Sequence, residues 1–218
     1  MPPKPKFSKE EIIDAALDIV SRKGVAALTA RELGEKLGSS PSPIFTVFKS
    51  MDELAQAVRA EAMLRYEEYV SRAKDYFPSF KAIGILMLRY AKEQPKLFQL
   101  LFMNENAQAR QFEDVFDSLG ETAKLCIEFV MTDYGLTDEE ARFLFQYVWT
   151  FTYGLSAMCA TGMCAFSEDE LLSMLGNEFM AVMRFIKSGM RGKAVTDIRP
   201  VKRGESGSPE ALGFNEEN

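Results

Sequence analysis

The side chains that most often perform catalysis or bind transition metals are scarce in this sequence. It contains no histidine, which excludes Ser-His and Cys-His nucleophile pairs and removes the commonest metal ligand. Its cysteines, Cys126, Cys159 and Cys164, form no C-x-x-C pair, so we expect small buried thiols in a reducing cytoplasm. No pair of Cys, Asp, Glu or Lys stands at a catalytic motif spacing. We therefore predict a protein that is not an enzyme, with no catalytic residue, no metal site and no cofactor.

Aromatic and methionine side chains gather in the second half of the chain and suggest a different chemistry, the binding of a small apolar molecule. Such side chains adapt to flat or amphipathic ligands, although each one taken alone is more often plain core. A sugar or nucleotide is disfavoured because the chain has no glycine-rich phosphate loop. The residues predicted to contact a ligand are Met87, Tyr90, Phe102, Met103, Phe112, Phe116, Tyr147, Trp149 and Tyr153.

The elements that must position these side chains are helices. The pattern S/T-x-x-E, in which a hydroxyl and a carboxylate cap a helix start reciprocally, precedes five apolar-periodic segments, at Ser8/Glu11, Thr29/Glu32, Ser50/Glu53, Thr137/Glu140 and Ser167/Glu170. No strand-like alternation competes with it, so we predict an all-α fold. The predicted helices cover residues 9–23, 30–38, 40–49, 52–76, 79–93, 95–102, 107–134 with a bend at Gly120, 137–161 and 167–188.

The second and third predicted helices form a helix-turn-helix pattern. Gly34 is a poor helix former, which predicts that a second backbone approaches closely there. Pro41 and Pro43 fit only the first turn of a helix, where amides have no intrahelical partner, and this places the helix start at Ser40. Two short helices joined at Gly38 and Ser39 are typical of the motif.

Three runs of this region, IIDAA (12–16), LTARELGEKLG (28–38) and PIFTVFKSMDEL (43–54), resemble the N-terminal DNA-binding domain of TetR-family transcriptional regulators. The resemblance implies a homodimeric repressor, controlled by a small-molecule effector, that binds a double-stranded DNA operator. The chain departs from the family pattern at Phe45, Val47 and Met51, where Tyr, His and Lys are common.

The start of the third helix is the part that enters a major groove in this motif, so its side chains are candidates for reading bases. Ser and Thr are permissive readers, Pro43 and Phe45 could touch thymine methyl groups, and Lys49 is a candidate phosphate ligand. The predicted DNA-binding residues are Thr29, Ser39, Ser40, Ser42, Pro43, Ile44, Phe45, Thr46 and Lys49.

The last two predicted helices have wide apolar faces, and no charge occurs between residues 143 and 167. The polar Gln and Thr residues in that stretch argue against a membrane span, so we expect a buried helix or a subunit interface. We predict a homodimer whose interface contains Phe145, Thr152, Leu171, Leu175, Phe179 and Val182.

Charge is spread unevenly over the 218 residues, whose net charge is −6. Residues 1–59 hold nine Lys and Arg against eight Asp and Glu, which is compatible with a locally basic face on an acidic protein. The polar N-terminal segment does not read as a secretion signal, and we expect a cytoplasmic protein. The Gly-rich end of the chain predicts a mobile tail whose basic first half is a candidate for DNA contact.

The predicted organisation is an N-terminal arm (1–7), a three-helix DNA-binding domain (8–51), a larger helical ligand-binding and dimerisation domain (52–188) and the tail (189–218). The function indicated is a ligand-responsive repressor that leaves a palindromic operator when an apolar or amphipathic effector binds. The alternative is a helical small-molecule-binding or scaffold protein that has lost sequence-specific DNA binding, because the usual Tyr, His and Lys are missing. An enzyme is a third and weaker alternative.

Overall fold

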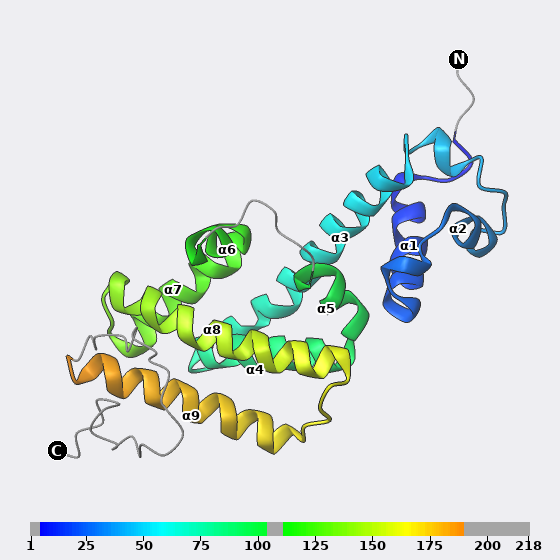
Figure 1. Ribbon diagram of the computed structural model, residues 1–218. Helices are drawn as coiled ribbons and strands as arrows, with labels where there is room; N and C mark the ends of the chain where they lie inside the picture. Colours follow the sequence, from blue (N-terminus) through cyan, green and yellow to red (C-terminus); the bar gives the residue numbers. More distant parts are fainter. Residues whose placement is uncertain (1–4, 104–110, 190–218) are drawn as a thin grey trace, which may run out of the picture.

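The computed structural model describes residues 5–103 and 111–189, and every regular element in these ranges is helical, as predicted (Figure 1). The first residues of the predicted arm, the start of the segment predicted from residue 107 and nearly all of the predicted tail lie outside the described residues. The α-helices are α1 (Lys9–Lys23), α2 (Ala30–Lys36), α3 (Met51–Ser71), α4 (Ser79–Glu93), α5 (Pro95–Phe102), α6 (Phe112–Ser118), α7 (Gly120–Tyr134), α8 (Asp138–Thr161) and α9 (Glu168–Lys187). The 3-10 turns are η1 (Val25–Ala27), η2 (Ile44–Thr46) and η3 (Arg72–Asp75).

The predicted capping residues begin α1, α2, α3, α8 and α9, and in each case the hydroxyl accepts a hydrogen bond from the third helical amide. Both halves of the capping box form at α1, α8 and α9. At α2 the carboxylate of Glu32 pairs instead with Lys23 at 2.5 Å. At α3 the carboxylate of Glu53 accepts a hydrogen bond from the amide of Lys49 at 2.7 Å. The pattern therefore predicts the helix starts correctly, while two of its carboxylates have other partners.

Two predicted helices are interrupted in the structure. The helix predicted to continue to Tyr76 ends as an α-helix at Ser71 and tightens into η3 before Pro78. The bend predicted at Gly120 is confirmed as a break between α6 and α7, where Gly120 has a φ of +56°, a conformation that glycine adopts without steric cost.

Helices α1 and α2 with η2 form a small N-terminal unit, from which α3 runs as a long diagonal rod towards the larger helical part (Figure 1). Ile12, Leu33, Ile44 and Phe48 fill the core of this unit, together with Leu54 from the first turn of α3. Since α3 begins at Met51, it carries the chain without interruption across the predicted domain boundary at residues 51 and 52.

The larger part is built around α8, which packs against α4, α5, α7 and α9. Its apolar centre includes Val130, Leu144 and Phe145, which are almost fully buried. Helix α5 contacts α1, α3 and α8, so it lies between the N-terminal unit and the larger part (Figure 1). In residues 5–103 and 111–189, no helix combines the length and the apolar character that a bilayer crossing requires.

Candidate functional site

The turn between α2 and η2 has the close backbone packing that Gly34 predicts. A Cβ atom at Gly34 would lie 3.0 Å from the carbonyl oxygen of Ser39 and 3.2 Å from the nitrogen of Pro41. Gly38 then reverses the chain with a φ of +63°. These two glycines let the chain fold back onto α2, so that η2 and the turn before it are held against the N-terminal core.

The predicted helix 40–49 is not an α-helix in the structure, which corrects that part of the expectation. The amides of Ile44, Phe45 and Thr46 bond to carbonyls three residues earlier, at 3.0 to 3.2 Å, and only η2 has regular geometry. Pro41 and Pro43 have no amide hydrogen, and proline disfavours the α conformation of the residue before it, so two prolines so close together weaken the start of an α-helix here. The element that would present side chains to DNA is therefore a tight 3-10 turn.

Six of the predicted DNA-binding residues have exposed side chains that DNA could reach. Phe45 is 46% exposed although it is aromatic, and Thr46 is exposed with its hydroxyl donating to the carbonyl of Pro43 at 2.7 Å. Thr29 caps α2. The others in this accessible group are Ser40, Ser42 and Lys49, while Pro43 is half-buried.

Ile44 and Ser39 differ from this group. Ile44 is fully buried and packs in the core with Phe48, so the prediction that Ile44 contacts DNA is wrong. Its apolar type, four residues before Phe48, was the signal that could have placed it inside. Ser39 is half-buried, and its hydroxyl accepts a hydrogen bond from the ammonium of Lys6 at 3.1 Å.

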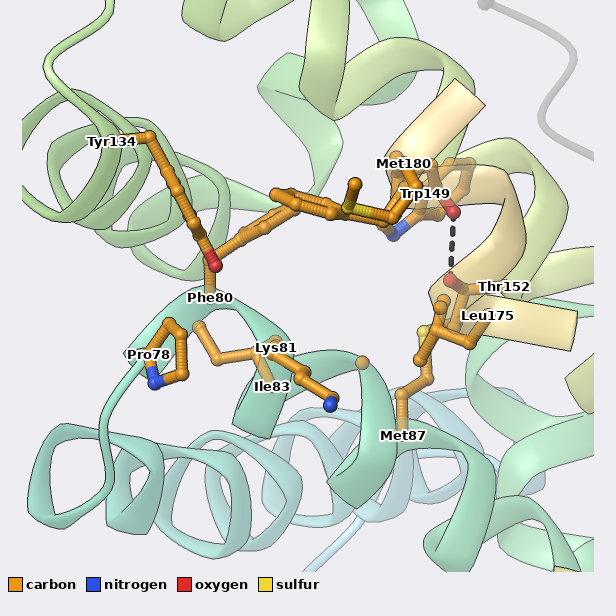
Figure 2. Close-up of a pocket in the computed structure, with 14 residues that line it drawn as sticks. Pro78, Phe80, Lys81, Ile83, Met87, Tyr134, Trp149, Thr152, Leu175 and Met180 are labelled. Carbon is orange, nitrogen blue, oxygen red and sulfur yellow. Dashed lines mark hydrogen bonds between the residues drawn. The ribbon is translucent and has the colours of Figure 1, made fainter. Parts of the chain in front are cut away.

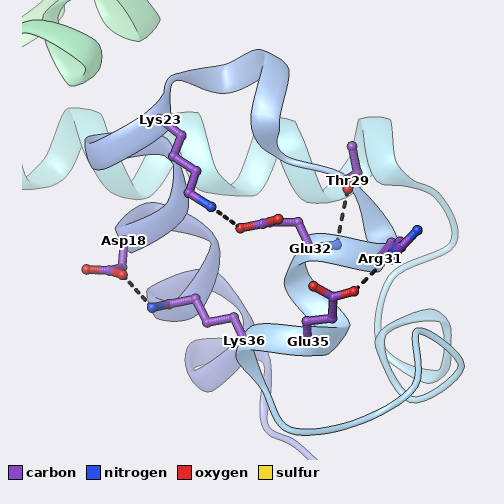
Figure 3. Close-up of polar contacts among 7 residues, drawn as sticks. All are labelled: Asp18, Lys23, Thr29, Arg31, Glu32, Glu35 and Lys36. Atoms are coloured by element: carbon purple, nitrogen blue, oxygen red, sulfur yellow. Dashed lines mark hydrogen bonds and ion pairs between the residues drawn. The ribbon is translucent and has the colours of Figure 1, made fainter.

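Most cations of the N-terminal unit are already neutralised by carboxylates of the same unit. Figure 3 shows Lys23 against Glu32, Arg31 against Glu35 and Lys36 against Asp18. The ammonium of Lys36 hydrogen-bonds to Asp18 and so lowers the pKa of that carboxyl group. The pairs of Lys23 and Lys36 tie α1 to α2, that of Arg31 lies within α2, and together they leave little net positive charge on α2 itself.

Three lysines around η2 have no carboxylate partner within the described part of the chain. These are Lys6, whose ammonium bonds to Ser39; Lys9, whose ammonium lies 5.8 Å from the centre of the Phe48 ring; and Lys49. Sequence reasoning singled out Lys49 but left Lys6 and Lys9 unassigned at the motif. Their signal was the basic character of the arm, whose position beside η2 only the fold reveals.

A second feature is an apolar cavity of about 270 Å³ between α4, α8 and α9 (Figure 2). Apart from Lys81, Tyr134, Trp149 and Thr152, its described lining residues carry no polar side-chain group. The lining residues are Pro78, Phe80, Lys81, Ile83, Gly84, Met87, Tyr134, Val148, Trp149, Thr152, Leu175, Gly176, Phe179 and Met180.

Only two of the predicted ligand residues, Met87 and Trp149, line this cavity. Tyr90, Phe102 and Tyr153 belong instead to a cluster of rings beside α5, in which Tyr66 contacts both Tyr90 and Phe102 at about 5 Å between ring centres. Residue type alone does not distinguish these two environments, because both are apolar and aromatic.

The remaining predicted ligand residues are not part of the described cavity lining. Phe112 and Phe116 pack edge-on against Phe145. Met103 and Tyr147 are exposed, Tyr147 by 49%. The predicted ligand residues therefore share only Met87 and Trp149 with the described lining of the cavity.

Five of the six residues predicted for a dimer interface are buried inside the subunit, whereas Phe179 is half-buried. Phe145, Leu171 and Val182 are buried in the core of the larger part, and Thr152, Leu175 and Phe179 line the cavity. Because the same chain already covers the five buried side chains, they offer little surface to a partner. The wide apolar faces of the last two helices are explained by contacts of α8 and α9 with each other and with α4.

The protonation and hydrogen bonding of two polar side chains on the cavity lining follow from their surroundings. Burial raises the pKa of Tyr134 to about 12, with a further contribution from the negative charge of the neighbouring Asp133, so the phenol is protonated at neutral pH. Thr152 donates its hydroxyl proton to the carbonyl of Val148 at 2.7 Å, the contact drawn in Figure 2. Lys81 is therefore the only cationic group among the described lining residues.

Comparison with known proteins assigns this arrangement to a family. Residues 12–58 match the model of the bacterial regulatory proteins of the tetR family. The chain is 25% identical over 150 residues to the class D tetracycline repressor protein of Escherichia coli, and equally so to the class H protein of Photobacterium damsela subsp. piscicida. Each alignment covers 68% of this chain and 65% of the relative.

Solved structures with the same fold come from regulators that are distant in sequence. A TetR-like transcriptional regulator from a Rhodococcus species aligns with a TM-score of 0.59 and 19% identity, over 84% of this chain and 99% of that one. A TetR-family regulator structure from Mesorhizobium loti gives 0.56 and 18%, over 81% and 95%. The matched segment covers α1, α2, η2 and the start of α3, which is the unit that carries the helix-turn-helix. The chain therefore belongs to the TetR family of transcriptional regulators, a family of non-enzymatic proteins.

Proposed function

We propose that this protein is a repressor that binds a palindromic DNA operator as a homodimer and is released by a small apolar or amphipathic effector. The observation that carries the proposal is the surface around η2. There Lys6, Lys9 and Lys49 have no carboxylate partner among residues 5–103 and 111–189, and the side chains of Phe45 and Thr46 are exposed. Cations that are not internally neutralised are the ones that gain most from phosphate contact. The repressor role follows the tetracycline repressor proteins that this chain resembles.

The chemistry of this surface indicates how DNA would be held. The lysines would contact phosphates and set the position of η2, while Ser40, Ser42 and Thr46 would reach base edges in a major groove. In a dimer the two motifs would occupy half-sites about 34 Å apart or a multiple of that distance. Because no Arg or Asn projects from η2, we expect direct base reading to be modest.

The homodimer is proposed to form through the outer face of α8. Gln146, Tyr147, Thr150, Gly154 and Thr161 recur along this helix, are all exposed and carry no charge. An uncharged helical face of this length is well suited to a self-complementary interface around a two-fold axis. This face replaces the buried residues that the sequence pattern favoured.

The effector is proposed to act from the cavity through α5. Trp149 lines the cavity and stacks on Tyr153 at 5.4 Å between ring centres, and Tyr153 hydrogen-bonds to the end of α5. Since α5 also contacts α1 and α3, a ligand beside Trp149 could change the orientation of the N-terminal unit. The ligand would shift the equilibrium between two orientations of the N-terminal unit only by the difference in its binding free energy for them.

The second candidate is a ligand-binding protein without sequence-specific DNA binding. The observation in its favour is that η2 is a short 3-10 turn and carries Phe45 and Val47, where the family commonly has Tyr and His. It predicts binding of small molecules in the cavity with no preference among DNA sequences.

Selection of DNA fragments by the purified full chain separates the two candidates. Random and genomic fragments are bound at about 0.15 M salt, where specific contacts survive screening, and the retained DNA is sequenced. The repressor proposal expects a palindrome, and the double variant Lys6→Ala, Lys49→Ala should lose its enrichment. Retention of fragments without any shared sequence, by protein shown to be folded and dimeric, would favour the second candidate.

A further inference from the structure

The charge of the cavity between α4, α8 and α9 differs from that of the surface around it. Lys81 is the only charged side chain among its described lining residues, and no ion pair joins Lys81 to a carboxylate in residues 5–103 and 111–189. Some surface cations of the larger part do have such partners, for example Arg89 with Glu168 and Lys124 with Glu121. Lys81 is thus an unneutralised cation at the edge of an apolar space.

The position of Lys81 in α4 strengthens this positive potential. It lies in the first turn of α4, the positive end of the helix dipole, and that turn contains no acidic side chain. The carboxylate of Asp133 accepts a hydrogen bond from the amide of Ser79 at 2.8 Å and so offsets part of the positive potential at this helix start. Figure 2 shows Lys81 on the α4 wall beside Ile83, with its ammonium nitrogen towards Met87.

The size and polarity of the cavity limit what else the ligand can carry. A volume of about 270 Å³ holds roughly nine groups of the size of a water molecule, at about 30 Å³ each. Thr152 has already donated its hydroxyl proton, which leaves the protonated phenol of Tyr134 and the indole N–H of Trp149 as the other donors on the lining. A sugar or a nucleotide would leave most of its polar groups unpaired here, which disfavours both. A cationic ligand would be opposed by Lys81.

We propose that the cavity binds an amphipathic monocarboxylate of about ten non-hydrogen atoms, with its hydrocarbon part against Trp149 and Phe80 and its carboxylate on Lys81. The identity of this ligand as an effector rests on the proposed function, whereas its binding does not. Trp149 is the single tryptophan of the chain and lines the cavity, so its fluorescence reports occupancy directly.

The test compares octanoate with 1-octanol, a neutral molecule of similar length, by titrating each into the full-length protein and following Trp149 emission. Octanoate should change the emission in a saturable manner. Lys81→Met should weaken octanoate about fivefold, the value for a charged hydrogen bond that remains partly exposed to water, and leave 1-octanol within about twofold. Lys74→Met removes an exposed charge from η3, outside the cavity lining, and should change neither.

A second variant locates the ligand without relying on charge. Gly176 lines the cavity, and open space surrounds the position of its missing Cβ, so Gly176→Met should occupy the cavity at small cost to folding and abolish binding of both ligands. No saturable response to octanoate overturns the proposal. So does an octanoate affinity that Lys81→Met leaves unchanged, or binding that survives in Gly176→Met.

Failure of the effector role is measured separately. If octanoate binds beside Trp149 but does not release selected DNA, the ligand class stands and control by this ligand fails. If the protein selects no DNA sequence at all, the repressor proposal fails, while the Trp149 titration still decides the ligand class.

Discussion

The phenol of Tyr153 on α8 donates a hydrogen bond of 3.0 Å to the carbonyl oxygen of Phe102, the last residue of α5. One residue earlier, the carbonyl oxygen of Leu101 accepts a hydrogen bond of 3.0 Å from the guanidinium of Arg59 on α3. The last carbonyls of a helix have no partner within the helix, so both bonds satisfy groups that would otherwise be orphaned. The end of α5 is therefore held from the cavity side by α8 and from the DNA-binding side by α3.

This arrangement predicts that Tyr153→Phe lowers stability and uncouples ligand from DNA. Loss of one partly buried hydrogen bond should reduce the free energy of unfolding by about 1 kcal/mol in urea denaturation. The effector concentration that releases half of the bound DNA should rise, while effector affinity measured without DNA stays near the wild-type value. Tyr76→Phe is the matched control, because Tyr76 is 62% exposed. An unaltered release curve for Tyr153→Phe would remove this bond from the coupling path.

Local sequence signals predicted the framework of this fold well. The capping residues Ser8, Thr137 and Ser167 fix helix starts through bonds to amides three residues away, and such short-range chemistry can be read from sequence. Gly34 likewise indicated a close backbone approach because its packing partner lies only five residues away, at Ser39. At Pro43 two local preferences compete, because proline favours the first turn of a helix but disfavours the α conformation of the residue before it. The sequence pattern therefore predicted an α-helix where the structure has a 3-10 turn.

The candidate sites were predicted less well because they depend on contacts between distant segments. Phe179 and Tyr153 are both aromatic residues on apolar helix faces, yet one lines the cavity and the other caps α5. Lys6 reaches Ser39 across 33 positions of sequence, which no short-range rule foresees. Periodicity identifies the inward face of a helix but not which of several neighbours that face meets.

The contact at Gly34 predicts opposite effects for two glycine-to-alanine substitutions. Gly34→Ala should lower the free energy of unfolding by about 1–3 kcal/mol, since its Cβ would meet backbone atoms at 3.0–3.2 Å that cannot move aside cheaply. Gly154→Ala should raise it by about 0.5–1 kcal/mol, because α8 leaves open space there and alanine favours helix. Chemical denaturation of both variants measures the difference. Equal effects would contradict the close packing of the turn.

The ion pairs of the N-terminal unit predict unequal contributions of its cations to DNA affinity. Lys49→Ala should weaken binding across sequences and reduce the slope of log affinity against log salt by about one unit, as expected for one lost phosphate contact. Arg31→Ala should reduce the slope by less, because Glu35 already pairs with Arg31 at 3.0 Å. Fluorescence anisotropy over a range of salt concentrations measures both slopes. A larger effect for Arg31 would show that its ion pair opens on DNA.

Tyr134 predicts a stability change at high pH. Burial and the adjacent Asp133 raise its pKa to about 12 in the folded protein, whereas the pKa of a solvent-exposed tyrosine in an unfolded chain is about 10. Between these values the unfolded state has lost a proton that the folded state keeps, so stability is complete below pH 10 and falls as the pH rises towards 12. Wild type should lose stability more steeply than Tyr134→Phe in this range. Parallel curves would contradict the raised pKa.

The exposed uncharged face of α8 predicts where a dimer is disrupted. Tyr147 is 49% exposed in the middle of this face, so Tyr147→Arg would bury an unpaired charge in the proposed interface and should raise the dissociation constant by about a hundredfold or more. Leu64 on α3 is the matched control, because it is a 61% exposed apolar residue outside α8 and Leu64→Arg should leave the dimer intact. Sedimentation velocity at micromolar concentration distinguishes the two variants. Both side chains are exposed in the subunit, so neither substitution should disturb its fold. A Tyr147→Arg protein that keeps the wild-type sedimentation coefficient and helical content would therefore place the interface on another face.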